Sequence, residues 1–404
     1  MKATVKPGIA RGKMSAPPSK SMGHRMLICA GLSGGPCAVT GIIPSEDMLA
    51  TLDCLSALGV EYRWQGDTVT LRGGDVFTSP KEPVCCRESG STLRFFVPLF
   101  LLGKQKVTLT GKGRLMERPL EVYQNLCRER TLLFGREEDK LYVRGPFQPG
   151  LYTLPGNVSS QFVSGLLFAL PLLQAGSVIS LTPPVESRPY IEMTRQAQAL
   201  FGVESVWTDE NTLRVFGGQT YQPVDTTVEG DWSNAAFLEG FNLLGGDVQV
   251  ENLIENSLQG DKIYKEYYKL LQNGCPTLDI SQCPDLGPVL MALAAAGQGA
   301  TLTGTRRLKI KESDRGAAMA EELAKLGVRC ALEEDRITIP GGQLKASAQP
   351  LDGHNDHRVV MALTLLLSRV GGEIEGAQAV RKSFPDFFER IRTLGIQVDT
   401  HEDR

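Results

Sequence analysis

A short segment of alternating apolar and polar residues, rich in β-branched side chains, recurs six times along the chain and ends each time in a small or turn residue. A polar loop and then an amphipathic helical stretch follow each copy. Such alternation is typical of a half-buried strand, so the pattern predicts six strand–helix units. The copies are Val39–Gly41, Val107–Gly111, Val178–Thr182, Val248–Asn252, Ala300–Gly304 and Glu373–Gly376.

A glycine is expected to close the helix of each unit, because glycine fits the left-handed position that ends a helix. The copies follow one another at intervals of about 70 residues, of which the fourth interval is shorter. This period is longer than the ~20–50 residues of solenoid repeats. A chain of 404 residues favours two domains, hence three units in each. The break is expected near Val228–Gly230. The closing glycines are Gly59, Gly135, Gly202, Gly274, Gly327 and Gly395.

Composition adds mainly exclusions. With 42% hydrophobic and 22% charged residues and a net charge of −3, the chain is an ordinary globular protein. It shows no excess of positive charge for nucleic acid or a membrane surface. The longest apolar runs, such as Phe95–Leu102 and Gly165–Leu173, are shorter than the ~20 residues of a membrane span. Nine cysteines without C-x-x-C indicate free thiols in a reducing compartment. With no secretory signal, we expect a cytoplasmic protein or the mature form of an organellar one.

Several loops carry cations, hydroxyls or amides where helices are expected to begin, which favours binding of phosphate or carboxylate groups. Lys20, Ser21 and Arg25 stand at the start of an apolar run that two prolines precede. Gly90–Arg94 is a small-residue turn where a backbone can approach a ligand closely. Ser159–Gln161 opens another apolar run, where its side chains either cap the helix or bind phosphate. No G-x-x-x-x-G-K-[ST] or G-x-G-x-x-G occurs, so no nucleotide cofactor is expected.

Two acidic positions have both a structural and a chemical interpretation. Asp285 precedes an apolar helix, so it is either the N-cap of that helix or a general base that faces a hydroxyl group. Glu312 lies in the charged segment Lys309–Arg315, which predicts either a solvated loop or a carboxylate flanked by cations for acid–base chemistry. His354 and His357 form H-x-x-H, but no further His or Cys is nearby, so we expect no metal.

Taken together, these loops resemble those of the 5-enolpyruvylshikimate-3-phosphate synthase family. The similarity covers nearly the whole chain, and the motifs occur in the family's order. They are P-S-K-S-x-x-x-R at Pro18–Arg25, G-[ST]-x-x-R at Gly90–Arg94, E-R-P at Glu117–Pro119, S-S-Q at Ser159–Gln161, S-[KR]-P-Y at Ser187–Tyr190, Q-G-D at Gln259–Asp261, P-D at Pro284–Asp285, K-E-[ST]-D-R at Lys311–Arg315, N-D-H-R at Asn355–Arg358 and K-[ST]-F-P-D at Lys382–Asp386.

The resemblance implies an α/β fold of two similar domains, each made of three copies of one α/β unit in an inside-out barrel. The active site would lie in the interdomain cleft, toward which helix N-termini point, and domain closure would complete it. The N-terminal segment of the family crosses to the C-terminal half. We therefore expect one domain at 19–228 and a second, discontinuous domain at 1–18 plus 229–404. No cofactor is implied, and we expect a monomer.

The implied reaction transfers the enolpyruvyl group of phosphoenolpyruvate to the 5-hydroxyl of shikimate 3-phosphate through a tetrahedral intermediate that loses phosphate. By position, Asp285 would be the base on the hydroxyl, Glu312 the acid toward C3, and Lys20 a cation between the two ligands. The positions implied for shikimate 3-phosphate are Lys20, Ser21, Arg25, Ser159, Ser160, Gln161, Ser187, Asp285 and Lys311. The positions implied for phosphoenolpyruvate are Lys20, Gly90, Arg118, Gln161, Arg315, Arg358 and Lys382.

The chain departs from the family pattern at two places, and two other functions fit its sequence less well. Arg307 stands where many members have asparagine, and Glu88-Ser89 replaces the commoner Asn-Ala before Gly90; the retained glycine implies room for the inhibitor glyphosate. The related transferase acting on UDP-N-acetylglucosamine has a loop cysteine and an Asn after its lysine, both missing here. A non-catalytic anion-binding protein would not need two carboxylates among anionic ligands.

Overall fold

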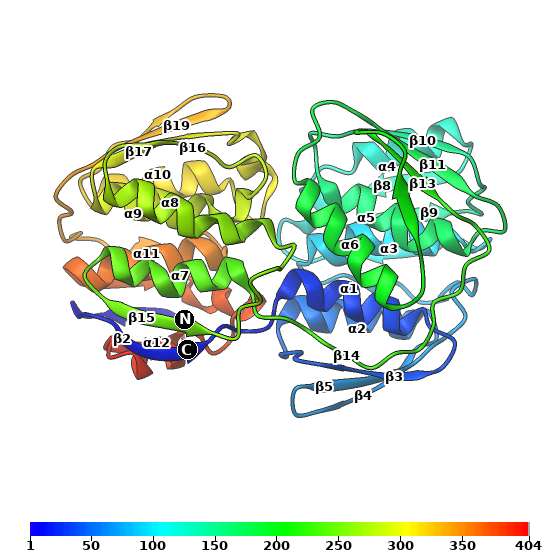
Figure 1. Cartoon of the computed structure of the whole chain (residues 1–404), viewed down its shortest axis with the longest axis horizontal. Coiled ribbons are helices and arrows are strands. Elements are labelled where there is room, and N and C mark those ends of the chain that lie inside the picture. Colours follow the sequence, from blue (N-terminus) through cyan, green and yellow to red (C-terminus); the bar gives the residue numbers. More distant parts are fainter. Residues whose placement is uncertain (403–404) are drawn as a thin grey trace. The chain divides into compact units, whose positions relative to one another are not determined.

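The computed structural model describes residues 1–402 and divides the chain into two compact units (Figure 1). The first unit is Pro18–Glu229, and the second combines Met1–Pro17 with Gly230–Arg404. The fold is mixed α/β, as the sequence predicts. No helix among the described residues is long and apolar enough to cross a membrane.

The two ends of the chain meet in the second unit. Strand β1 (Lys2–Val5) pairs antiparallel with both β21 (Gly372–Glu375) and β22 (Val398–His401). Strand β2 (Arg11–Ser15) pairs parallel with β15 (Asp247–Glu251). The N-terminal residues therefore complete two sheets whose other strands come from the C-terminal half.

Five four-stranded sheets share one topology, in which the first two strands are parallel and the other two pairs antiparallel. The recurring segments of the sequence are strands β3, β7, β11, β15, β17 and β21, and each lies in a different sheet. The repeat is therefore structural. The sheet orders are β14-β3-β5-β4, β6-β7-β9-β8 and β10-β11-β13-β12 in the first unit, and β16-β17-β19-β18, β20-β21-β1-β22 and β15-β2 in the second.

The strands of the first unit are β3 (Pro36–Thr40), β4 (Glu61–Gln65), β5 (Thr68–Arg72), β6 (Val84–Cys85), β7 (Val107–Thr110), β8 (Leu133–Glu137), β9 (Lys140–Arg144), β10 (Leu151–Pro155), β11 (Ser177–Thr182), β12 (Ser205–Trp207), β13 (Thr212–Val215) and β14 (Thr226–Thr227). The remaining strands of the second unit are β16 (Thr277–Asp279), β17 (Gly299–Thr303), β18 (Ala331–Leu332), β19 (Arg336–Pro340) and β20 (Leu351–Asp352).

Among the residues that the structure describes, each unit has six α-helices, of which alternate members are buried on nearly every side. The helices are α1 (Lys20–Gly31), α2 (Glu46–Ala57), α3 (Gly90–Phe100), α4 (Glu121–Glu129), α5 (Ser160–Ala169), α6 (Arg188–Leu200), α7 (Trp232–Leu243), α8 (Tyr264–Gln272), α9 (Gly287–Ala296), α10 (Arg315–Lys325), α11 (His357–Val370) and α12 (Phe387–Thr393), with 3-10 turns η1 (Leu115–Glu117), η2 (Leu170–Leu172), η3 (Gly260–Ile263), η4 (Pro284–Leu286), η5 (Arg306–Ile310) and η6 (Ala377–Lys382). The odd-numbered α-helices are the apolar, interior ones.

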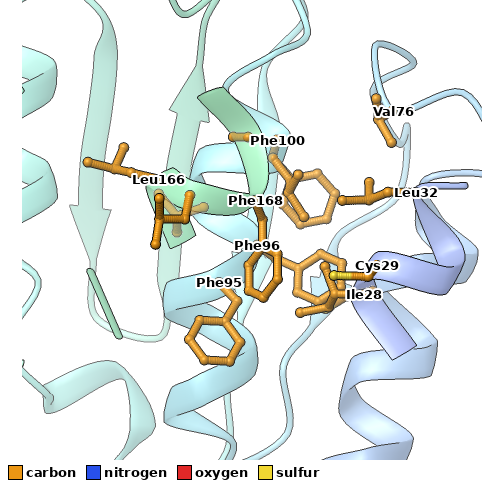
Figure 2. Close-up of a cluster of buried hydrophobic side chains, with 14 of the residues drawn as sticks. Ile28, Cys29, Leu32, Val76, Phe95, Phe96, Phe100, Leu166 and Phe168 are labelled. Atoms are coloured by element: carbon orange, nitrogen blue, oxygen red, sulfur yellow. The ribbon is translucent and has the colours of Figure 1, made fainter. Parts of the chain in front are cut away.

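The interior of the first unit is filled by these helices rather than by strands. Figure 2 shows Phe95, Phe96 and Phe100 of α3 near Phe168 of α5 and Ile28 of α1. The rings of Phe95 and Phe168 meet edge to face, with centroids 5.4 Å apart. This helix-inside arrangement matches the expected architecture, although the described strands form separate sheets and close no barrel.

Polar side chains fix where the interior helices begin. The hydroxyls of Ser19, Ser89 and Ser159 accept backbone N–H groups at the starts of α1, α3 and α5, and Asp231 and Asp356 do so at α7 and α11. Such caps satisfy donors that the helix leaves unpaired. The first turns of these helices are therefore firmly placed.

The prediction that a glycine closes each helix is wrong at one position. Gly135 lies inside β8, whereas α4 ends at Glu129 and Thr131 takes the left-handed conformation, with φ 55°. Gly59, Gly202 and Gly327 do adopt positive φ after their helices. A threonine was not a candidate because a β-branched residue rarely adopts this conformation.

Replacing Phe96 with alanine should lower the free energy of unfolding by about 3–5 kcal/mol, because its ring is completely buried and would leave a cavity. The measurement is urea unfolding followed by fluorescence. The control is Phe77→Ala, since Phe77 is 52% exposed and should change stability by less than about 0.5 kcal/mol. Equal losses in both variants would contradict the assignment of the core.

Candidate functional site

Three cations of the second unit share the carboxylate of Asp285. Arg315 Nη1 and Lys311 Nζ lie 2.8 and 3.1 Å from its Oδ1, and Arg358 Nη2 lies 3.0 Å from its Oδ2. Asp285 belongs to η4, directly before α9, and its side chain caps no helix. The N-cap interpretation of Asp285 is therefore wrong, and its carboxylate instead forms ion pairs with these three cations.

Arg315 joins this carboxylate to two others. Its Nη2 donates to Glu312 Oε2 at 2.6 Å, and its Nε donates to Asp356 Oδ2 at 2.8 Å. Ser313 Oγ also donates to Asp356, which is completely buried. The segment Lys309–Arg315 is thus no solvated loop, since Arg315 has only 1% of its side chain exposed. We call Asp285, Lys311, Glu312, Arg315, Asp356 and Arg358 the Asp285 cluster.

Charge and burial compete in this cluster. Burial opposes ionisation of Asp285, but Arg358, Lys311 and Arg315 outweigh it and hold its pKa well below the usual range. Burial, together with the nearby Arg307 and Arg315, lowers the pKa of Lys311 to about 8, against the opposing effect of Asp285. The cluster therefore contains one firmly ionised carboxylate and one lysine whose charge changes near neutral pH.

Two cations of the second unit that the sequence analysis named, Arg358 and Lys382, make contacts with further elements of that unit. Arg358, in the first turn of α11, also donates to Ser233 Oγ at the start of α7. Lys382, at the end of η6, is nearly buried and donates to the backbone carbonyl of Asn355 at 2.7 Å. Both cations are thus fixed by contacts from other elements.

In the first unit, Lys20 and Arg25 of α1 are each held by other helices. Lys20 Nζ donates to Asp47 Oδ2 of α2 at 2.9 Å, and both side chains are largely buried. Arg25 Nε donates to Thr194 Oγ1 of α6 at 2.8 Å, and its Nη2 reaches the carbonyl of Tyr190. Arg25 therefore braces α1 against α6.

Gly90, Arg94, Arg118 and Gln161, which we call the Gly90 group, lie together. Arg94 Nη1 donates to Gln161 Oε1 at 2.7 Å, and Gln161 Nε2 donates to Ser91 Oγ at 2.9 Å. A Cβ atom on Gly90 would lie 2.3 Å from Arg118 Nη1. Glycine is therefore required for Arg118 to keep this position.

The remaining expected residues stand at the starts of helices α5 and α6. Ser159 caps α5, where its Oγ accepts the N–H of Gln161, and Ser160 is nearly buried. Ser187 precedes α6 in a left-handed conformation, with φ 52°, and is completely buried. Helix N-termini carry partial positive charge and unpaired N–H groups, which suit anions.

Several contacts of these groups were not expected from the sequence. Asp47, Asp356 and Ser233 bind Lys20, Arg315 and Arg358, respectively. Arg94, which lies inside the recognised turn, orients Gln161. Of these residues, only Arg94 and Asp356 could have been identified from the sequence, because each lies within a matched motif. Asp47 and Ser233 are distant from their partners in sequence.

The chain is similar to known proteins over almost its full length. The family model of EPSP synthase (3-phosphoshikimate 1-carboxyvinyltransferase) matches residues 6–391. The 3-phosphoshikimate 1-carboxyvinyltransferase of Clostridium kluyveri is 38% identical and that of Clostridium acetobutylicum 36%, each match covering 98% of both chains. A solved EPSP synthase from Acinetobacter baumannii shares the fold, with a TM-score of 0.78, 23% identity and coverage of 100% of both chains.

Replacing Arg315 with methionine should lower the free energy of unfolding by about 3–5 kcal/mol near neutral pH, because the buried Asp356 and the largely buried Asp285 and Glu312 lose their shared cation. Protonation at acid pH relieves their repulsion, so the deficit should shrink as pH falls. Urea unfolding at several pH values measures it. The control Arg114→Met removes an exposed pair with Glu117 and should cost under about 1 kcal/mol. A loss independent of pH would contradict the electrostatic explanation.

Proposed function

This chain belongs to the EPSP synthase (3-phosphoshikimate 1-carboxyvinyltransferase) family, and from that premise we propose that it transfers the enolpyruvyl group of phosphoenolpyruvate to the 5-hydroxyl of shikimate 3-phosphate, releasing phosphate. This reaction belongs to the shikimate pathway toward aromatic amino acids. The observation that carries the proposal most directly is the carboxylate of Asp285 held by three cations.

Both substrates bear a phosphate and a carboxylate, so a site for the pair needs many cations close together. Arg315, Arg358 and Lys382 are proposed for phosphoenolpyruvate with Arg118 and Gly90 of the other unit. Lys311 is proposed for shikimate 3-phosphate, together with Arg25 and the serines at the starts of α5 and α6. A net charge of −3 means that this positive charge is local.

The Asp285 cluster supports a role for its carboxylates as partners that substrate anions can displace. In the structure, Arg315, Arg358 and Lys311 neutralise Asp285. An incoming phosphate or carboxylate competes for the same cations, because charge-assisted contacts to guanidinium groups are strong. Each cation drawn to the substrate removes one interaction that lowers the pKa of Asp285. Substrate binding thereby turns a firmly ionised carboxylate into a better proton acceptor.

The chemical roles are those that the resemblance to the family implies. Asp285 takes the proton of the 5-hydroxyl as its oxygen bonds to C2 of phosphoenolpyruvate, and Glu312 delivers a proton to C3. The intermediate then loses phosphate while the carboxylate of Glu312 takes a proton back from C3, which restores the double bond. Lys20 stabilises the negative charge between the ligands. Such acid–base groups contribute about 10²–10⁴-fold each.

Two further expectations belong to the proposal. We propose that the protein acts as a monomer. The nine cysteines form no disulfide in the part of the chain that the structure describes, which supports a reducing compartment such as the cytoplasm.

Phosphate release from the purified protein should require both shikimate 3-phosphate and phosphoenolpyruvate, and Asp285→Ala should reduce kcat by about 10²–10⁴-fold. Phosphoenolpyruvate binding, measured by calorimetry, should survive this substitution. Asp399→Ala, at an exposed position of β22, is the control and should keep full activity. Release with one substrate alone would contradict the proposed reaction, and near-wild-type activity of Asp285→Ala would contradict the role of the base.

The activity should depend on the charge of Lys311, whose pKa is lowered to about 8. Lysine is charged below its pKa, so kcat/KM for shikimate 3-phosphate should fall as pH rises through this value. In Lys311→Arg the guanidinium stays charged, and the fall should move to higher pH. Lys269→Arg, in an exposed pair of α8, should leave the profile unchanged. An identical profile in Lys311→Arg would rule out Lys311 as its source.

A further inference from the structure

The turn between β20 and α11 holds two consecutive residues in an unfavourable conformation. His354 and Asn355 have φ values of 48° and 52°, the left-handed region that side chains with a Cβ atom rarely adopt. Such residues cost on the order of 1–3 kcal/mol each and persist only where their surroundings hold them. Something outside the turn must therefore fix it.

Glu322 of α10, whose side chain is completely buried, provides that support. Its Oε2 accepts the backbone N–H of Asp352 at 2.9 Å, and its Oε1 lies 2.9 Å from His354 Nε2. Lys325 Nζ donates to both carboxylate oxygens, at 2.8 and 2.9 Å. Asp352 Oδ1 in turn accepts the backbone N–H of His354 at 2.7 Å. One buried carboxylate thus binds both the start and the middle of the turn.

The next residues of the same turn hold three cations of the proposed phosphoenolpyruvate site. The carbonyl of Asn355 accepts from Lys382 Nζ at 2.7 Å. Asp356 caps α11 and binds Arg315 Nε at 2.8 Å. Arg358 follows in the first turn of that helix. A shift of the turn would therefore displace acceptors of Lys382 and Arg315 together.

We propose that Glu322 and His354 are positioning residues for phosphoenolpyruvate, because their contact fixes the 352–356 turn that places Lys382 and Arg315. The inference rests on the proposed function. Neither side chain belongs to the Asp285 cluster, and neither is among the residues expected to bind a substrate. Their influence on the reaction passes through the backbone of Asn355 and the carboxylate of Asp356.

The charges around His354 support an ion pair in this contact. The hydrogen bond to Glu322 raises the pKa of His354, burial opposes it, and Asp352 and Glu321 add to the rise. With Lys325, these are the charged groups of α10 and of the turn that face the imidazole. Glu321, Glu322 and His354 have ligand atoms close enough to hold a cation, but the ammonium of Lys325 already donates to both oxygens of Glu322.

The test compares His354→Ala with His354→Gln, whose amide can still donate to Glu322. In His354→Ala the KM for phosphoenolpyruvate should rise roughly three- to thirtyfold, the size of effect that residues without ligand contact exert on a site. The KM for shikimate 3-phosphate should change less than about twofold, within the scatter of neutral surface changes. His354→Gln should recover most of the loss. His401→Ala, at an exposed position of β22, is the matched control.

Amide hydrogen exchange across 352–358 gives a readout that does not depend on activity. Exchange there should quicken in His354→Ala and return toward wild type in His354→Gln. Equal rises in both KM values, a glutamine variant no better than alanine, or unchanged exchange would each overturn the positioning role. A wild-type protein that releases no phosphate with both substrates would refute the proposed function instead, and the exchange result would still decide whether this contact fixes the turn.

Discussion

The arrangement of the second unit depends on the mutual repulsion of cations that must stay close together. Arg315, Arg358 and Lys311 converge on one carboxylate, whose negative charge offsets part of the repulsion between them. Burial strengthens both the attraction and the repulsion, because the local dielectric constant is low. Asp285, Glu312 and Asp356 therefore neutralise these cations within the second unit.

The repeated fold provides the positions for this charge. Each repeat sends an apolar helix into the interior of its unit, and the capped start of that helix is where polar side chains emerge. Lys20, Gly90, Gln161 and Arg358 all lie in first turns of interior helices. One structural unit, repeated, thus supplies several helix starts of a kind that suits anions, in a chain with no net positive charge.

The sequence predicted the central strand of every repeat because alternation is a local property that needs no knowledge of partners. It did not predict the sheet partners of β1 and β2, which lie hundreds of residues away, nor the left-handed Thr131, whose conformation tertiary contacts impose. In the site, motif residues were identifiable by resemblance. Asp47 and Ser233 were not, because each is defined only by a cation that folding brings to it.

The proposal that substrate anions take the cations of Asp285 can be tested directly. The measurement is a crystal structure with phosphoenolpyruvate and a 5-deoxy analogue of shikimate 3-phosphate, which lacks the reacting hydroxyl. At least one of Arg315, Arg358 and Lys311 should then leave Asp285 and contact the phosphate or carboxylate of a ligand. If both ligands were bound and all three contacts kept their distances of 2.8, 3.0 and 3.1 Å, the claim would be contradicted.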